Sequence, residues 1–193
     1  MDAKAVAMLG MLAAVGGVVR ALGPGTAGLE PSFAVIILGG RVFGRGFGFV
    51  LGALSLFTGG LPTGGVGPWL PFQMVAAGWV GFVAGCLPAA RGRLEVFWLA
   101  VYLSVVGVVF GLVMNLWFWP FASYGPETSF VTDDSFAANL SRYWLFSVTT
   151  SLLWDLGRSV LFALAVLLAG GALLPALRRA SRRAAFDAVA VFE

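Results

Sequence analysis

Two ionisable side chains lie close together inside a long apolar segment near the C-terminus of the sequence. Asp155 and Arg158 are three residues apart, so in a helix they share one face and can form an ion pair. Charged residues inside membrane segments usually face a solvated cavity and hold the polar groups of a ligand. The spacing leaves two interpretations open, a structural ion pair and a ligand-binding pair.

Other polar residues lie near those ends of the apolar segments that would form the external side of a membrane protein. Arg20 ends the first segment, Glu30 precedes the second, and two amides, Gln73 and Asn115, lie near the corresponding ends of two others. The amides suit either hydrogen bonds between helices or contacts with a ligand. If these ends meet, they form a cup. The predicted ligand-binding residues are Arg20, Glu30, Phe33, Trp69, Phe72, Gln73, Asn115, Trp119, Asp155 and Arg158.

Two glycine-rich segments suggest different roles. Residues 58–69 contain five glycines and two prolines, and we interpret this loop as a lid over the cup, with a tight turn between helices as the simpler alternative. The glycines of residues 44–52 resemble part of a nucleotide-binding fingerprint, which requires a preceding β-strand. No strand is predicted there, so these glycines favour close packing between membrane helices.

The composition excludes most soluble enzymes. The 193 residues are 60% hydrophobic and 11% charged, whereas a soluble domain carries roughly 25% charged residues. The mean hydropathy is +0.94. Without His and with the single cysteine Cys86, the chain lacks the residues for an internal disulfide, a His-based metal site or a Ser-His-Asp triad. The sequence therefore predicts a membrane protein that is not an enzyme and binds neither metal nor nucleic acid.

Apolar segments separated by short charged turns predict an all-α membrane protein, a bundle of six transmembrane helices within residues 1–176. The helices are expected at 4–22, 31–44, 46–60, 70–89, 94–119 and 143–174, followed by a basic tail at 177–193. The positive-inside rule places both termini in the cytoplasm, because nine of the 12 basic residues fall on one predicted side. These are Lys4, Arg41, Arg45, Arg91, Arg93, Arg178, Arg179, Arg182 and Arg183.

Small residues recur at four-residue spacing along the first predicted helix. This spacing lets another helix approach closely. That helix can belong to the same bundle or to a partner subunit, and the sequence leaves both possibilities open. The pairs are Ala3/Ala7, Gly10/Ala14 and Ala13/Gly17.

The middle of the sequence contains an unusual order of glycine, proline and aromatic residues. Residues 67–74 read Gly-Pro-Trp-Leu-Pro-Phe-Gln-Met, and they lie between the glycine-rich segment 39–55 and two short motifs at 78–81 and 84–85. Together these segments resemble the substrate-specific S component of energy-coupling factor (ECF) vitamin importers, and the resemblance covers most of the chain. The resemblance implies a six-helix protein that lies in the cell membrane (the inner membrane, where there are two) of a bacterium or archaeon. Such a protein captures a vitamin or trace nutrient from outside the cell.

The resemblance also implies partners. An S component hydrolyses no ATP and needs no cofactor; it docks on a membrane coupling subunit that carries two ATPases, and these use the ATP. In the family a small-residue strip on the first helix makes this contact, and the matching residues here are Gly10, Ala14, Ala3 and Ala7. The form of the central segment resembles S components for cobalamin or another corrinoid.

A self-sufficient secondary transporter of a small organic solute, coupled to protons through Asp155, is the alternative function. Such carriers often have internal repeats and more than one intramembrane carboxylate. The sequence shows neither, so the S component is the favoured interpretation.

Overall fold

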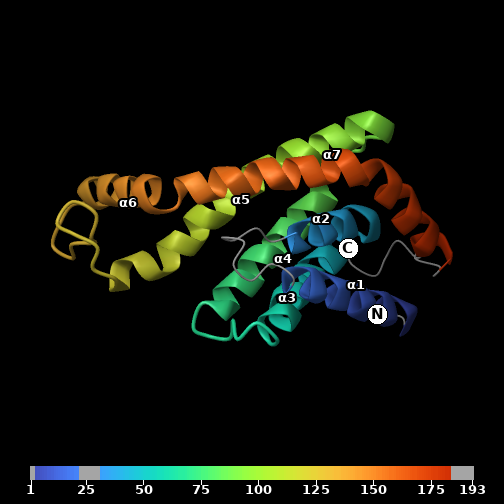
Figure 1. Cartoon of the computed structure of the whole chain (residues 1–193), viewed down its shortest axis with the longest axis horizontal. Coiled ribbons are helices and arrows are strands. Elements are labelled where there is room, and N and C mark those ends of the chain that lie inside the picture. The colour runs from blue at the N-terminus through green and yellow to red at the C-terminus, as the bar shows by residue number, and fades with distance from the viewer. Residues whose placement is uncertain (1–2, 22–30, 184–193) are drawn as a thin grey trace.

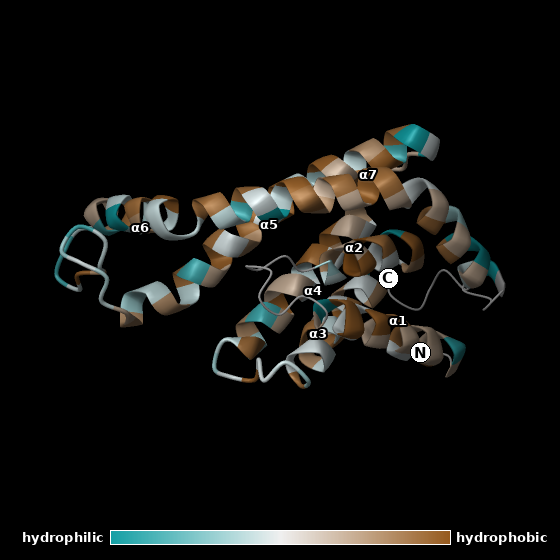
Figure 2. Ribbon diagram, viewed as in Figure 1, coloured by the Kyte–Doolittle hydropathy of each residue, from teal (hydrophilic) through white to brown (hydrophobic). Residues whose placement is uncertain are grey.

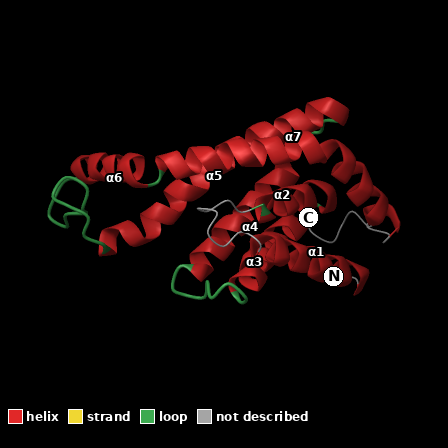
Figure 3. Cartoon of the chain, in the orientation of Figure 1, coloured by secondary structure: helices red, strands yellow, loops and turns green. Residues whose placement is uncertain are grey.

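Helices make up most of the described part of the chain, which comprises residues 3–21 and 31–183 of a computed structural model (Figures 1 and 3). Seven α-helices and one 3-10 turn are assigned in these residues. They are α1 (Ala3–Ala21), α2 (Ser32–Phe43), α3 (Arg45–Gly60), α4 (Leu70–Cys86), α5 (Gly92–Phe118), η1 (Trp119–Phe121), α6 (Phe136–Thr150) and α7 (Leu152–Arg183).

The first five predicted helices agree with α1 to α5 within a few residues. The prediction of a single helix at 143–174 is wrong. Two helices replace it, because the chain leaves the helical conformation at Ser151, where φ is −123°. Hydroxyl groups around this point bond to carbonyls three or four residues earlier, which competes with regular helix geometry. At the other end, α7 runs past the predicted boundary at 176 and includes residues 177–183 of the predicted tail.

Glycine contacts bring α2, α3 and α4 together with backbone against backbone. A Cβ at Gly48 of α3 would lie 2.3 Å from the carbonyl oxygen of Gly81 and 2.7 Å from the Cα of Gly40. A Cβ at Gly52 would lie 2.2 Å from the carbonyl oxygen of Ala77. Only glycine permits such an approach, so the prediction of close packing is confirmed for Gly48 and Gly52.

The helix ends sort into two groups at opposite ends of the bundle. Arg41, near the end of α2, donates hydrogen bonds to the carbonyls of Leu87 and Pro88 after α4, and to Glu95 in the first turn of α5. Arg178, near the end of α7, bonds to the same carboxylate. At the opposite end, the last turns of α1 and α3 meet the first turn of α4. We refer to these as the Glu95 end and the Gln73 end.

The molecule is elongated, because α5 and α7 form a long antiparallel pair that extends beyond α1 to α4 and carries α6 at its far end (Figure 1). An aromatic core joins the two parts: the ring of Phe33 on α2 lies 4.8 Å from that of Phe110 on α5 and 5.3 Å from that of Phe162 on α7. Many of the exposed residues of these helices are large and apolar, and Figure 2 shows apolar residues along much of their length. That pattern fits contact with lipid.

Three of the described helical segments are long and apolar enough to cross a membrane: Ala3–Ala21, Gly92–Phe121 and Leu152–Arg182. The apolar helices α2 and α4 are shorter. With 12 residues, α2 is only about 18 Å long, against about 30 Å for the hydrocarbon core of a bilayer.

Candidate functional site

At the Gln73 end, two of the predicted binding residues are hydrogen-bonded to each other. Arg20 in the last turn of α1 donates from Nη2 to Oε1 of Gln73 over 3.0 Å and from Nη1 to the carbonyl of Leu56 over 3.5 Å. The arginine stem crosses α3 at Gly59, where a Cβ would lie 2.6 Å from it. Glu30, predicted to lie nearby, falls outside the described residues.

The glycine-rich segment predicted as a lid is a turn held by its own hydrogen bonds. Thr63 bonds to the carbonyl of Gly59 over 2.9 Å, and the Gly65 amide bonds to the carbonyl of Gly60 over 2.9 Å. The indole of Trp69 donates to the carbonyl of Gly65 over 3.2 Å while its ring stays 40% exposed. This arrangement presents an aromatic face at the edge of the Gln73 end. Closure over a ligand stays a prediction.

A second set of polar residues lies along the contact between α5 and α7, and we call it the polar seam. Asn115 donates to Ser151 over 2.7 Å and is 3.4 Å from Ser147. Farther along, Gly111 and Gly107 leave room for Asp155 and Ser159, because a Cβ at either glycine would lie 2.1 or 2.2 Å from the facing side chain. The seam residues are Gly107, Gly111 and Asn115 on α5, Ser151 directly before α7, and Asp155 and Ser159 in the first turns of α7.

The seam was not predicted from the sequence, although the sequence contains a signal for it. Its residues recur every four positions on both helices, which puts each set on one face of its helix. Small residues allow a close approach, and the polar ones satisfy each other in a medium without water.

Asp155 and Arg158 form the predicted ion pair inside the seam. Arg158 Nη2 lies 3.2 Å from Asp155 Oδ1, and the side chains are 14% and 2% exposed. Even so, neither carboxylate oxygen accepts a hydrogen bond from the described residues, and the Nε of Arg158 donates none. The guanidinium also lies over the ring of Phe110, 5.9 Å from its centre. Buried groups with unused hydrogen-bonding capacity are costly and can bind a polar ligand.

Stacked aromatic rings connect the Gln73 end with the far part of α5. Phe72 lies against Trp117 with 4.8 Å between ring centres and an angle of 12°. Half of the Phe72 side chain is exposed. The predicted binding residues within the described part of the chain therefore fall into two polar groups. One is the Arg20–Gln73 pair and the other is the polar seam. The stacked rings of Phe72 on α4 and Trp117 on α5 lie between the helices of the two groups.

Two of the aromatic residues predicted to contact a ligand also have structural partners. Phe33 is fully buried in the aromatic core between α5 and α7. Trp119 is 4% exposed and donates from its indole to the carbonyl of Thr128 over 2.7 Å. A ligand would reach either ring only if this packing opened, so their proposed contact with substrate stays a prediction.

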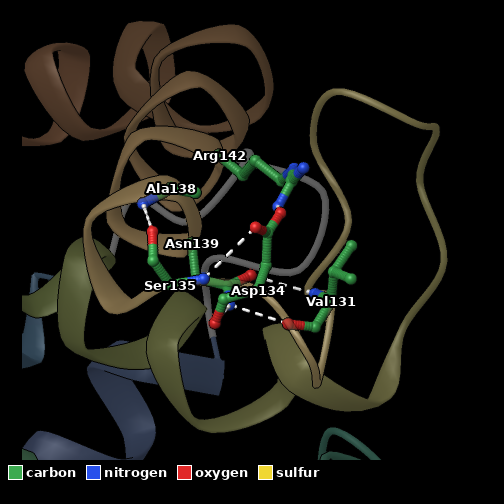
Figure 4. Close-up of polar contacts among 6 residues, drawn as sticks. All are labelled: Val131, Asp134, Ser135, Ala138, Asn139 and Arg142. Atoms are coloured by element: carbon green, nitrogen blue, oxygen red, sulfur yellow. Dashed lines mark hydrogen bonds and ion pairs between the residues drawn. The ribbon is translucent and has the colours of Figure 1, made fainter.

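The loop between η1 and α6 is fastened by a short polar network (Figure 4). Asn139 accepts from the amide of Val131 over 2.9 Å and donates to the carbonyl of the same residue over 2.8 Å. Ser135 caps α6 by accepting from the amide of Ala138 over 3.2 Å. Arg142 donates to Asp134. This hydrogen bond lowers the pKa of the Asp134 carboxyl.

Asn139→Ala should loosen this loop. It removes both bonds to Val131, and loss of a buried hydrogen-bonding partner costs about 1–3 kcal/mol. We expect the Val131 amide to exchange with solvent at least about fivefold faster, as measured by hydrogen–deuterium exchange. Arg142→Gln is the control, because an exposed ion pair contributes little to stability. The stabilising effect of the Asp134–Arg142 pair is present at pH values above the ordinary carboxyl pKa. It is lost as the pH falls through the lowered pKa of Asp134. Equal exchange in both variants would contradict the anchoring role of Asn139.

The small residues of α1 divide between two faces. Ala13, Gly16 and Gly17 are buried, and a Cβ at Gly16 or Gly17 would lie 2.5 Å from a side-chain oxygen of α3. The predicted docking residues Ala3, Ala7, Gly10 and Ala14 are all exposed. The structure thus separates the two possibilities: Ala13/Gly17 pack inside the bundle, and the other two pairs face outward.

Comparison with known proteins identifies the family. No curated protein and no solved structure matches the chain. The family described as "ECF transporter, substrate-specific component" matches residues 4–169. This match includes both polar groups and the exposed strip of α1 apart from Ala3. The chain therefore belongs to the substrate-specific components of ECF transporters.

Proposed function

We propose that this chain captures a vitamin-like micronutrient outside a bacterial or archaeal cell and delivers it by docking on a coupling subunit with two ATPases. Family membership over residues 4–169 carries this proposal. In it, the partner ATPases use ATP, while this chain catalyses no reaction and needs no cofactor. Residues 1–176 form the binding domain and residues 177–193 a basic tail.

The proposed orientation has six crossings and places the Glu95 end in the cytoplasm. In this arrangement α1 to α5 and α7 cross the membrane, and α6 lies on the outer side. The short α2 needs local thinning of the bilayer. Support comes from the basic side chains at or near the Glu95 end, where the positive-inside rule expects them: Lys4, Arg41, Arg45, Arg91, Arg93, Arg178, Arg179 and Arg182.

The single cysteine tests this orientation. Cys86 is exposed at the last residue of α4, on the proposed cytoplasmic side. A membrane-impermeant maleimide should label it only after the cells are permeabilised. As a control, Glu127→Cys in a Cys86→Ala background should be labelled in intact cells. Labelling of Cys86 in intact cells would place the binding site on the wrong side for import.

The proposed substrate site combines the Arg20–Gln73 pair, the seam and the aromatic rings between them. Its residues are those predicted from the sequence, with Trp69 and Phe72 as apolar contacts and Asp155 and Arg158 as an adjacent acceptor and donor. An amide group has both an N–H and a carbonyl, so it can satisfy both side chains at once. A corrinoid such as cobalamin, which carries amides on a large apolar ring system, is the substrate we propose.

Arg158→Ala should weaken substrate binding. Loss of a hydrogen bond from a charged donor costs about 1.5–3 kcal/mol, so we expect roughly a tenfold to hundredfold higher Kd for cyanocobalamin. Isothermal titration of the detergent-solubilised chain measures this change, and a melting curve recorded beside it checks the fold. Arg142→Ala on the exposed loop is the control. A lower melting temperature with unchanged affinity would assign the Asp155–Arg158 pair to structure alone.

Transport assays test the function as a whole. The chain reconstituted in vesicles should take up cyanocobalamin only together with the coupling subunit, the two ATPases and ATP. Uptake by the chain alone, driven by a proton gradient, would instead support a secondary transporter. Mass spectrometry of small molecules that co-purify with the chain tests the choice of substrate independently.

A further inference from the structure

A cavity of about 550 Å³ lies between the first turn of α5 and the C-terminal part of α7. It is at the Glu95 end, opposite to the proposed substrate site. Its lining mixes charged, apolar and glycine residues: Gly92, Arg93, Glu95, Val96, Leu167, Gly170, Gly171, Leu174, Pro175 and Arg178.

The cavity contains a buried carboxylate with one unused oxygen. Glu95 is 2% exposed, and its Oε1 accepts hydrogen bonds from Arg41 over 2.7 Å and from Arg178 over 2.6 Å. Its Oε2 is buried as well and accepts none from the described residues. A carboxylate oxygen can accept two hydrogen bonds, and leaving a buried one without any is unfavourable. The Glu95 side chain therefore favours a ligand that brings a hydrogen-bond donor.

Backbone next to Pro175 supplies a second acceptor. Pro175 lies inside α7 and has no N–H to donate to the carbonyl of Gly171, four residues earlier. Both residues line the cavity. A Cβ at Gly171 would have no atom within 4 Å, so nothing outside its own helix packs against the Cα of Gly171 on that side. A positively charged donor in this cavity thus has two acceptors among the lining residues, the Glu95 carboxylate and the Gly171 carbonyl.

The same cavity also has groups that attract an anion. Arg93 and Arg178 line it, and α5 begins there at Gly92. The residue before this helix makes no side-chain cap, so the first amides of α5 remain available for a phosphate. The cavity therefore offers binding groups for a negative charge and for a positive one.

The surroundings indicate the source of such a ligand. Val96 and Leu174 form apolar walls, and Leu94, Leu167 and Leu168 nearby are 57%, 50% and 84% exposed. Leucines facing outward beside arginines are typical of the boundary between lipid and water. A molecule with a zwitterionic head and an apolar tail fits this position.

We propose that the cavity binds the headgroup of phosphatidylethanolamine. The phosphate contacts Arg93, Arg178 and the first turn of α5, and the ammonium donates to Glu95 Oε2 and the Gly171 carbonyl. The glycerol and the first methylene groups lie on Val96 and Leu174. This inference depends on the chain being a membrane protein, not on its substrate or its transport partners.

Phosphatidylcholine is the matched test ligand, since it has the same phosphate and positive charge but no N–H to donate. The delipidated full chain is mixed with equal amounts of the two lipids, carrying identical acyl chains, and examined by native mass spectrometry. We expect phosphatidylethanolamine adducts to exceed phosphatidylcholine adducts by about tenfold. Equal adducts would overturn the proposal. Stronger binding of phosphatidylglycerol, tested in the same way, would also overturn it by showing that net negative charge is recognised.

The variant Gly171→Leu tests whether the preference for phosphatidylethanolamine arises in this cavity. The new side chain enters open space, so the variant should fold and lose the preference for phosphatidylethanolamine. Gly157→Leu is its control, because Gly157 is also on α7 and a Cβ there meets no atom within 4 Å; this variant should keep the preference. Glu95→Gln is less informative, since it also disturbs Arg41 and Arg178. If Gly171→Leu keeps the preference, or if both variants lose it, the assignment to this cavity is wrong.

Discussion

Replacing Gly48 by alanine should strongly destabilise the packing of α2, α3 and α4. The added Cβ would lie 2.3 Å from the carbonyl oxygen of Gly81 and 2.7 Å from the Cα of Gly40. Both neighbours are backbone atoms, so no side chain can rotate away, and the helices themselves must separate. Overpacking a core commonly costs about 1–3 kcal/mol, and we expect the upper end of this range.

A melting curve of the purified protein in detergent measures the effect. For a chain of this size, about 3 kcal/mol lowers the melting temperature by roughly 6–12 °C. Gly10→Ala is the matched control: it adds the same methyl group to a helix, but with no atom within 4 Å, so helix propensity alone predicts a small gain. A melting temperature of Gly48→Ala close to that of wild type would show that these helices pack less rigidly than the structure indicates.

Gly48 also illustrates what the sequence could predict about the fold. The apolar segments and their charged turns located five helices, because burial in lipid requires long apolar segments with internally bonded backbone. The glycines within them indicated close packing. The break at Ser151 was missed because segment 143–174 is apolar on average, and hydropathy does not register hydroxyl groups that bond to the backbone.

The site was harder to predict than the helices. Sequence position correctly suggested that Arg20 and Gln73 lie at one end, and the ion pair followed from the spacing of Asp155 and Arg158. The orientation of each helix about its axis did not follow, because a helix that is apolar all round has no evident inner face. For this reason the burial of Phe33 in the aromatic core did not follow from the sequence.

The surroundings of Glu95 could not be predicted from the sequence either. Its partners Arg41 and Arg178 are 54 and 83 residues away in sequence, so only the fold brings the three together. From the sequence they were ordinary charges at the cytoplasmic boundary, where charged side chains are expected to reach water. Burial of the carboxylate was therefore unpredictable, and so was the cavity that it lines.

Substitutions in the exposed small-residue strip of α1 (Ala3, Ala7, Gly10 and Ala14) should strongly reduce transport. Gly10→Leu and Ala14→Leu, made together, should leave the affinity for cyanocobalamin unchanged and reduce ATP-dependent uptake by roughly fivefold to hundredfold. Both residues are exposed, and a Cβ at Gly10 meets no atom within 4 Å, so larger side chains do not disturb this chain. At the proposed interface they would hold the coupling subunit away, with an overpacking cost of about 1–3 kcal/mol.

Gly17→Leu separates docking from folding. It lies on the same helix, but a Cβ there would be 2.5 Å from Thr58 Oγ1 and 3.0 Å from the Gly59 amide. We therefore expect Gly17→Leu to lower the melting temperature and reduce both binding and uptake, whereas the outward variant keeps its melting temperature and binding. Co-purification with the coupling subunit identifies the step that fails. If the outward variant still co-purifies and transports normally, α1 is not the docking helix and its exposed small residues serve only contact with lipid.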